Sequence, residues 1–426
     1  MNSTIILKGN ILYTPNPSAL VSIQQGYVIA VDGVVVHCGE SIPTVYTEYD
    51  FVDYGDKLII PGFVDTHAHA PQYCNRGLGM DKELLPWLET YTFPEEAKFI
   101  DPDYARLVYG AFVHDLWRNG TTRSILFGTI HKDSTLVLME LLQKAGLSAY
   151  VGKVNMDRNS PEFLIEETNQ SLADTKVWLD ASAQFGPLVK PIITPRFVPS
   201  CTSELMTGLA KLAKEYDVPV QSHLSENHGE IDWVASLHPE SLNYTDVYYE
   251  HHLMGTVPTV MAHCIHLSDV EMDRMAETQT MVSHCPYSNV NLSSGIAPIR
   301  KLIERNIPIG LGSDISGGHI VSMAKVLTEA IGLSKMKWAE VDPNYAPLTL
   351  SEAFYMATKG GGQFFGHVGS FEKGYELDAL IIDDTSLFDP NERSLEERLE
   401  RWLYVGDDRH IIERYVAGRV VPSPKG

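Results

Sequence analysis

The chain is poor in basic residues, and this limits the partners that it can bind. Its 426 residues include 33 lysines and arginines against 55 aspartates and glutamates, which gives a formal net charge of −22 at pH 7. Nucleic acids and anionic membranes bind clustered positive charge, and no basic run offsets the acidity. We therefore predict a soluble protein that binds neither nucleic acid nor membrane.

Paired cysteines and long apolar runs are also lacking. The five cysteines are scattered and form no C-x-x-C pair, which is typical of a reduced cytosolic compartment. No apolar run approaches the roughly 20 residues that a membrane span needs. The N-terminus lacks the basic start and long apolar core of a signal peptide. These features predict a cytoplasmic protein.

The hydrophobic pattern changes near position 60. Before it, short apolar segments indicate β-strands, and Asp32-Gly33 is a strong hairpin signal. From Pro61 onward, strand, loop and helix repeat, which is typical of βα units around a parallel sheet. Eight such strands close a barrel of about 250 residues. The expected strands are Pro61–His69, Thr121–Ile125, Ala149–Lys153, Ile192–Thr194, Val218–Ser222, Val257–Ala262, Thr280–Val282 and Ile307–Ser313.

The two ends of the chain are expected to form a second unit. Strand character returns at Tyr375–Asp383 and Ile411–Val421, and the charged stretch Asp389–Arg401 between them predicts a solvated loop or a helix. We therefore predict an α/β protein with a TIM-like (β/α)8 barrel over residues 61–368. A small β-sandwich domain would be built from residues 1–60 and 369–426. The glycine-rich segment Gly360–Gly366 lacks the Lys-Ser/Thr of a phosphate loop and predicts a closely packed helix end.

Five side chains of metal-binding type lie at the ends of predicted strands. His67 and His69 close the first strand as His-x-His, and residues two apart on a strand point to the same face. Both imidazoles can therefore reach one ion. His223, His263 and Asp314 each follow an apolar strand of their own. The ends of barrel strands meet at one face, so the five residues together predict a metal site.

Imidazoles and a carboxylate form a donor set that suits Zn²⁺ or Fe²⁺. A catalytic ion keeps one position open for water and lowers the pKa of that water from about 15.7 to about 7. His263 has two open roles, because it either binds the ion or holds the bound hydroxide by a hydrogen bond. Asp314 is placed to accept the water's proton. The fourth strand has only Lys190, at its start, as a bridging candidate, so we predict one ion per chain.

Two further side chains belong to the same predicted strand ends. Glu226 lies three residues past His223, where a carboxyl group can give protons to a substrate or take them from it. The alternative for Glu226 is a solvated loop glutamate. His284 closes another strand, and it either lines the pocket without binding metal or packs elsewhere.

These motifs resemble the amidohydrolase superfamily, whose signature matches Pro61–His69. Within that superfamily, the chain is similar to the guanine deaminase family. This narrower resemblance rests on five motifs that keep the family's order: Pro195-Arg196-Phe197, His223-Leu224-Ser225-Glu226, His284–Asn289, Leu292–Gly295 and Gly310–Gly318.

The resemblance implies the ligands, the substrate contacts and the reaction. It implies one Zn²⁺ on His67, His69, His223 and Asp314, catalytic roles for Glu226, Asp314 and His263, and purine contacts from Gln72, Arg196, Phe197 and Glu226. An arginine fork and a glutamine amide can read the carbonyl oxygen and ring nitrogens of a purine, and a phenylalanine can stack on it. The implied reaction is hydrolysis of guanine to xanthine and ammonia through a metal-bound hydroxide, in a homodimer.

Two other functions stay open. One is a related amidohydrolase that acts on another aminopurine, a pterin or a triazine. The other is a non-catalytic scaffold protein on the same fold, although such a protein has no need of the complete ligand set.

Overall fold

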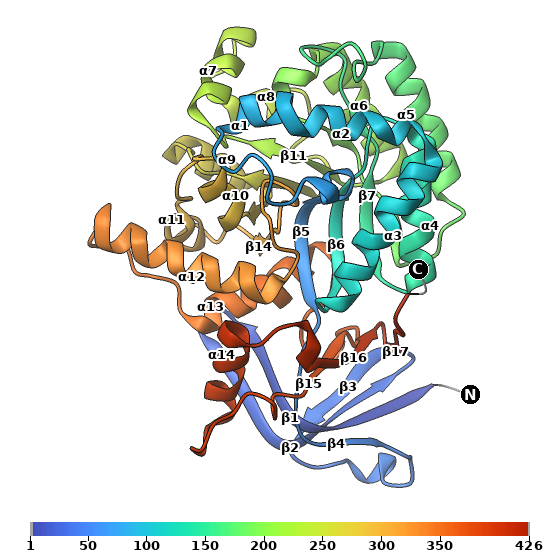
Figure 1. Cartoon of the computed structure of the whole chain (residues 1–426), viewed down its shortest axis with the longest axis vertical. Coiled ribbons are helices and arrows are strands. Elements are labelled where there is room, and N and C mark those ends of the chain that lie inside the picture. The colour runs from blue at the N-terminus through green and yellow to red at the C-terminus, as the bar shows by residue number, and fades with distance from the viewer. Residues whose placement is uncertain (1–2, 425–426) are drawn as a thin grey trace.

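The computed structural model describes residues 3–424, and strands from both ends of the chain share one sheet (Figure 1). This sheet has seven strands in the order β17-β16-β15-β4-β1-β2-β3. The strands are β1 Thr4–Asn16, β2 Ala19–Val31, β3 Val34–Gly39, β4 Val52–Pro61, β15 Ala379–Ile382, β16 Ile411–Val416 and β17 Arg419–Val420. The two ends meet where β15 pairs antiparallel with β4. Packing of this sheet into a sandwich stays a prediction.

Two parallel four-stranded sheets lie between the terminal strands. Their orders are β5-β6-β7-β9 and β11-β12-β13-β14, and β8 pairs with β10. The strands are β5 Phe63–His69, β6 Thr121–Phe127, β7 Ser148–Gly152, β8 Val154–Asn155, β9 Val189–Pro191, β10 Thr194–Pro195, β11 Val220–Leu224, β12 Thr259–His263, β13 Met281–His284 and β14 Ile309–Leu311. The chain therefore has an α/β fold with parallel sheets.

Backbone hydrogen bonds connect the two parallel sheets at both edges. Ile193 N donates to Pro219 O at 2.9 Å, beside the start of β11. At the other edge, Asp314 N donates to His67 O of β5 at 2.8 Å. The carboxyl ends of β5, β11 and β12 are thereby held at one side of the fold, and this positions the histidines that they carry.

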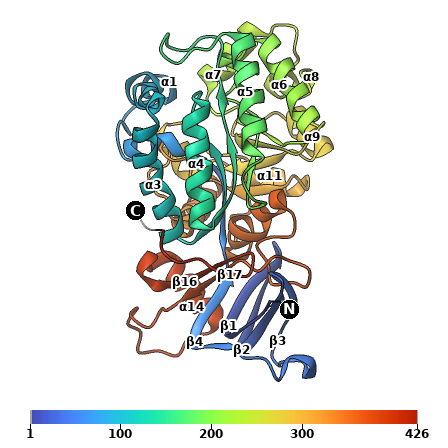
Figure 2. The same ribbon diagram turned by 90° about the vertical axis from the view of Figure 1, so that its right-hand side faces the viewer.

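Helices cover the parallel sheets from outside, as the two perpendicular views show (Figures 1 and 2). At the start of α3, the Asp101 side chain accepts a hydrogen bond from Asp103 N and caps the helix. The buried residues of α3 recur every three or four positions, as in an amphipathic helix. The α-helices are α1 Leu84–Trp87, α2 Phe93–Glu96, α3 Pro102–Arg118, α4 Lys132–Ala145, α5 Thr168–Ser182, α6 Ser203–Tyr216, α7 His228–Leu237, α8 Tyr244–Glu250, α9 Asp269–Thr278, α10 Pro286–Asn291, α11 Ile299–Glu304, α12 Met323–Glu340, α13 Leu350–Tyr355 and α14 Leu395–Val405. Short 3-10 or π turns are Thr44–Tyr46, Ala70–Asn75, Leu88–Thr92, Ala97–Ile100, Val198–Ser200, Met356–Gly360, Gln363–Phe365 and Asp408–His410.

The fourth predicted strand is divided in two. The sequence predicts one strand over Ile192–Thr194, whereas the structure has β9 before this segment and β10 at its end. Pro191 and Pro195 have no backbone N–H to donate to a ladder, so regular pairing stops at each. Ile192 N still bonds Val151 O of β7 at 2.9 Å.

Asp314 departs from the predicted strand-end pattern. Strand β14 ends at Leu311, so Asp314 lies three residues beyond it. Its φ is +45°, and that of His263 is +71°. Non-glycine residues adopt this left-handed region at a cost that is commonly met at functional sites. The loop after β14, rather than the strand itself, therefore directs the Asp314 carboxylate.

The charged stretch Asp389–Arg401 runs into α14, which buries Leu399, Trp402 and Leu403. The glycine-rich segment is closely packed, because a Cβ on Gly362 would lie 2.4 Å from Val368 O. Within residues 3–424, no helix is both long and apolar enough to cross a membrane.

Candidate metal centre and active site

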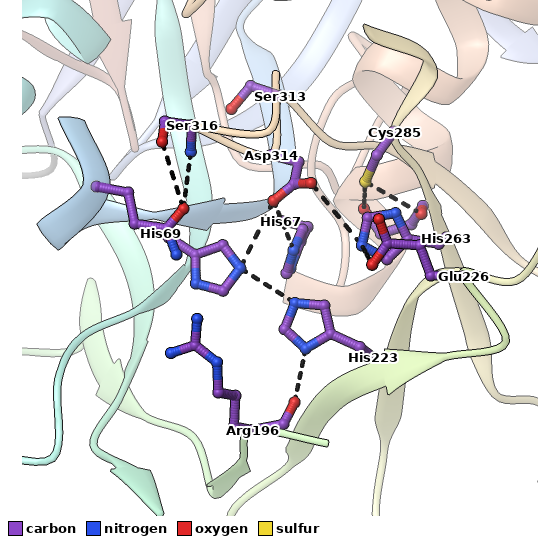
Figure 3. Close-up of polar contacts among 12 residues, drawn as sticks. His67, His69, Arg196, His223, Glu226, His263, Cys285, Ser313, Asp314 and Ser316 are labelled. Atoms are coloured by element: carbon purple, nitrogen blue, oxygen red, sulfur yellow. Dashed lines mark hydrogen bonds and ion pairs between the residues drawn. The ribbon is translucent and has the colours of Figure 1, made fainter. Parts of the chain in front are cut away.

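Three imidazoles and one carboxylate converge at the ends of the parallel strands (Figure 3). His69 Nε2 lies 3.1 Å from His223 Nε2. Asp314 Oδ1 lies 3.1 Å from His67 Nε2 and 3.5 Å from His69 Nε2. All four side chains are buried. The predicted placement of His67 and His69 on one face of β5 is confirmed, because their ring centroids are 4.9 Å apart.

The protonation states of His69 and His223 suit them to bind a cation. Burial, followed by the neighbouring His67, lowers the pKa of His69 and of His223 well below the usual histidine value, so both rings are neutral. The short contact of His223 Nδ1 with the Arg196 carbonyl, 2.6 Å, places the His223 proton on Nδ1 and leaves the Nε2 lone pair free. That lone pair faces His69 Nε2. His69 and His223 would therefore hold an ion as neutral imidazole ligands.

Asp314 supplies the negative charge of the cluster. Burial opposes ionisation of this carboxyl, but His67 and His263 outweigh it and hold its pKa at about 2. The possible donors form two overlapping sets, His67–His69–His223 and His67–His263–Asp314, with the donor atoms of each set within 4.8 Å of one another. These residues could therefore hold a metal ion, and the geometry leaves both roles of His263 open.

Glu226 is buried beside His263, so the alternative of a solvated loop glutamate is wrong. Its Oε2 lies 3.3 Å from His263 Nε2, and Oε1 accepts a hydrogen bond from Ser294 Oγ at 3.2 Å. Burial, followed by repulsion from Asp314, raises the pKa of Glu226 to about 8. A carboxyl group with a pKa near neutrality is suited to exchanging protons with a bound molecule.

The predicted purine-binding residues are buried next to the histidine cluster. Arg196 Nη1 pairs with Glu96 Oε2 at 2.6 Å, and Gln72 Nε2 donates to Glu96 Oε1 at 2.9 Å. Gln72 Oε1 accepts from Ser316 N at 3.1 Å. Phe197 is buried as well. Glu96 thus joins two residues that the sequence motifs mark, although no motif marks Glu96 itself.

One cavity brings these residues together. It is lined by His69, Gln72, Leu84, Trp87, Leu88, Arg196, Phe197, His223, Glu226, Glu230, His263, Leu292 and Asp314. No sequence motif marks its apolar wall, which comes from α1 and the turn after it. No motif marks Glu230 either, whose Oε2 accepts from Glu226 N at 2.9 Å.

His284 closes β13 as predicted but is not among the side chains that line the cavity. It is buried, and burial lowers its pKa to about 3. His284 is therefore a neutral, packed histidine, as in the second alternative from the sequence, that it packs elsewhere than in the pocket.

Comparison with known proteins places the chain in one family. The amidohydrolase family model matches residues 58–421. The guanine deaminase of Dictyostelium discoideum is 46% identical over 378 residues, which are 87% of this chain and 84% of that protein. The guanine deaminase of Escherichia coli (strain K12) is 37% identical over 416 residues, which are 95% of this chain and 92% of that protein.

Solved structures agree with the sequence comparison. The crystal structure of guanine deaminase from C. acetobutylicum with bound guanine in the active site has a TM-score of 0.96 and 50% identity, over 99% of this chain and 100% of that chain. A triazine hydrolase variant has a TM-score of 0.86 at 16% identity, which shows a shared fold alone. By the extent of the family match and the identity of these relatives, the chain belongs to the amidohydrolase family and, within it, to the guanine deaminases.

Proposed function

We propose that the protein hydrolyses guanine to xanthine and ammonia in the cavity described above. The observation that carries this proposal is the meeting of three kinds of group around one space: a metal-type cluster, a buried proton-exchanging carboxyl, and an arginine and glutamine suited to a purine. The C. acetobutylicum relative, at 50% identity, has guanine bound in its active site.

A single Zn²⁺ is the proposed cofactor, with Fe²⁺ as the alternative. His67, His69, His223 and Asp314 would hold it, and His263 would stand beside the reacting water. When bound, the ion supplies a water whose pKa is lowered to about 7. One ion per chain is supported by the exposure of Lys190 at the surface, which keeps it from bridging a second ion.

Arg196, Gln72 and Phe197 are the proposed purine contacts. Arg196 has further N–H groups beyond the one that bonds Glu96, and these can donate to the purine carbonyl oxygen. The Gln72 oxygen accepts from Ser316 N and Ser316 Oγ, and its amide nitrogen keeps one hydrogen for a ring nitrogen of the purine. Phe197 offers an apolar surface to the ring. A flat, neutral heterocycle with a carbonyl group fits this set.

The proposed proton movements balance the reaction. Glu226 gives its proton to the ring nitrogen next to C2 while the water oxygen adds to C2. Asp314 takes one proton from that water and passes it to the amino group, which leaves as ammonia. The hydroxyl proton left on C2 returns to Glu226 as the xanthine carbonyl forms. His263, 3.3 Å from Glu226 and 3.8 Å from Asp314, would hold the water between the two carboxyls.

The proposal also covers how the parallel strands close and how the chain divides into domains. We propose that β5 to β14 close a (β/α)8 barrel over residues 61–368, with residues 1–60 and 369–426 as a separate β-domain. The hydrogen bonds that join the two parallel sheets at both edges support closure. The homodimer and the cytoplasmic location stay predictions.

A substrate panel separates this proposal from a related amidohydrolase activity. Guanine, adenine, a pterin and an aminotriazine would be offered to the metal-loaded protein, and ammonia release would be followed. We expect kcat/KM for guanine to exceed that for each other compound by about 10²-fold or more, because buried polar groups left unpaired reject an analogue strongly. A triazine or pterin that is used as well as guanine would favour the related activity, and no release from any compound would favour a scaffold protein.

A further inference from the structure

Glu96 lies behind the purine-binding residues and contacts two of them. It ends α2 and is only 1% exposed. One carboxylate oxygen bonds Arg196 at 2.6 Å, and the other bonds Gln72 at 2.9 Å. A carboxylate that divides its two oxygens between two neighbouring side chains fixes both of them, since each bond is charge-assisted on at least one side.

The Gln72 amide has one possible orientation because of these contacts. Its oxygen accepts from Ser316 N, and its nitrogen donates to Glu96. A flipped amide would place its NH₂ against the Ser316 N–H and its oxygen against a carboxylate. Glu96 therefore decides which atoms of Gln72 remain to meet a ligand in the cavity.

Glu96 also balances the charge of Arg196. The guanidinium is 3% exposed, and a buried cation without a partner is strongly unfavourable. With Glu96 present, the positive charge of Arg196 is compensated by the paired carboxylate. Without it, Arg196 would offer an uncompensated positive charge, and an anion would bind there in preference to a neutral ring.

We propose that Glu96 is a positioning residue that orients Gln72 and Arg196 and makes the cavity select a neutral purine over an anionic one. This inference rests on the proposed function. It has a consequence for the reaction, because xanthine loses a ring proton more readily than guanine does. A neutral site holds the ionised product weakly, whereas a site with a free Arg196 charge would retain it.

The chain offers a matched control for Glu96. Glu95 precedes it on the same helix and is 5% exposed, but its carboxylate bonds Lys98 at 2.5 Å and the Tyr104 hydroxyl and does not line the cavity. Glu95→Gln and Glu96→Gln thus remove the same charge from neighbouring buried positions. Glu96→Asp keeps the charge and withdraws the carboxylate by one methylene.

Kinetics and binding would be measured at one mildly alkaline pH, where xanthine is ionised and hypoxanthine, which has the same carbonyl group, is neutral. For Glu96→Gln we expect KM for guanine to rise about ten- to hundredfold, the effect of a lost charge-assisted bond, with a smaller change in kcat. The ratio of the hypoxanthine Kd to the xanthine Kd should rise about tenfold or more. Glu96→Asp should raise KM and leave this ratio near wild type, and Glu95→Gln should change both by less than about twofold.

Equal KM and equal Kd ratios in Glu96→Gln and Glu95→Gln would overturn the inference. If Glu96→Gln does not fold, Glu96→Asp decides, since a wild-type KM in that variant would contradict positioning. Failure of the proposed function is a separate result, in which wild type and Glu95→Gln both release no ammonia from guanine. The two Kd values need no turnover and would still test Glu96 in that case.

Discussion

Replacing Glu226 with glutamine is expected to lower kcat for guanine by about 10²- to 10⁴-fold, the usual contribution of a positioned proton-transfer group. The substitution keeps the shape of the side chain and its hydrogen bond with Ser294, but an amide cannot deliver or recover the proton. Metal content and purine affinity should stay close to wild type. Steady-state kinetics, metal analysis and hypoxanthine binding on the same sample measure the three quantities.

Glu271 supplies the control for this variant. It is also a buried glutamate, and it bonds Ser268 at the start of α9 and Thr245, away from the cavity. Glu271→Gln should keep kcat within a few-fold of wild type if it folds. A Glu226→Gln protein that deaminates guanine at a near-normal rate would remove Glu226 from the proposed mechanism.

Removal of the metal is expected to lower the activity by a factor similar to that of Glu226→Gln. Treatment with a chelator should lower activity at least about hundredfold, because the reacting water then loses its lowered pKa. Added Zn²⁺ should restore the activity at one ion per chain. The loaded protein should also unfold at a higher temperature than the metal-free protein, since an ion that binds only the folded state stabilises it.

Single histidine variants test whether the metal-dependent activity requires the buried histidine cluster. His69→Ala should reduce both the bound metal and the activity, because its Nε2 faces His223 and Asp314. His114→Ala, at a half-exposed position on α3, should change neither. Full activity in a protein shown to contain no metal would contradict the proposed cofactor, and two ions per chain would contradict the single site.

The metal cluster could be predicted because its members follow a local pattern. The period of two along a strand is enough to place His67 and His69 on one face. Parallel strands have their carboxyl ends at the same edge of the fold, so His223 and His263 lie close to His67 and His69. Asp314 is predicted in identity but not in position, because the loop that carries it turns through a left-handed residue after β14 has ended.

The rest of the site depends on contacts between segments that are distant in sequence. Glu96 is 100 residues from Arg196, and nothing around it distinguishes a buried carboxylate from an exposed one. Leu84, Trp87 and Leu88 look like ordinary core residues and become a cavity wall only through tertiary packing. Helix α5 buries residues at helical spacing, but three of these five are serine or threonine, so the hydrophobic pattern of its sequence is weak: Ser171, Thr175, Trp178, Leu179 and Ser182.

The most direct test of the account is turnover of guanine in ¹⁸O-labelled water by metal-loaded protein. Hydrolytic attack at C2 predicts one ammonia for each guanine consumed and xanthine that carries a single ¹⁸O atom. Mass spectrometry of the xanthine and an ammonia assay on the same reaction give both values. Guanine left unchanged by protein with a full metal site, or ammonia released without label in the product, would contradict hydrolytic deamination in this cavity.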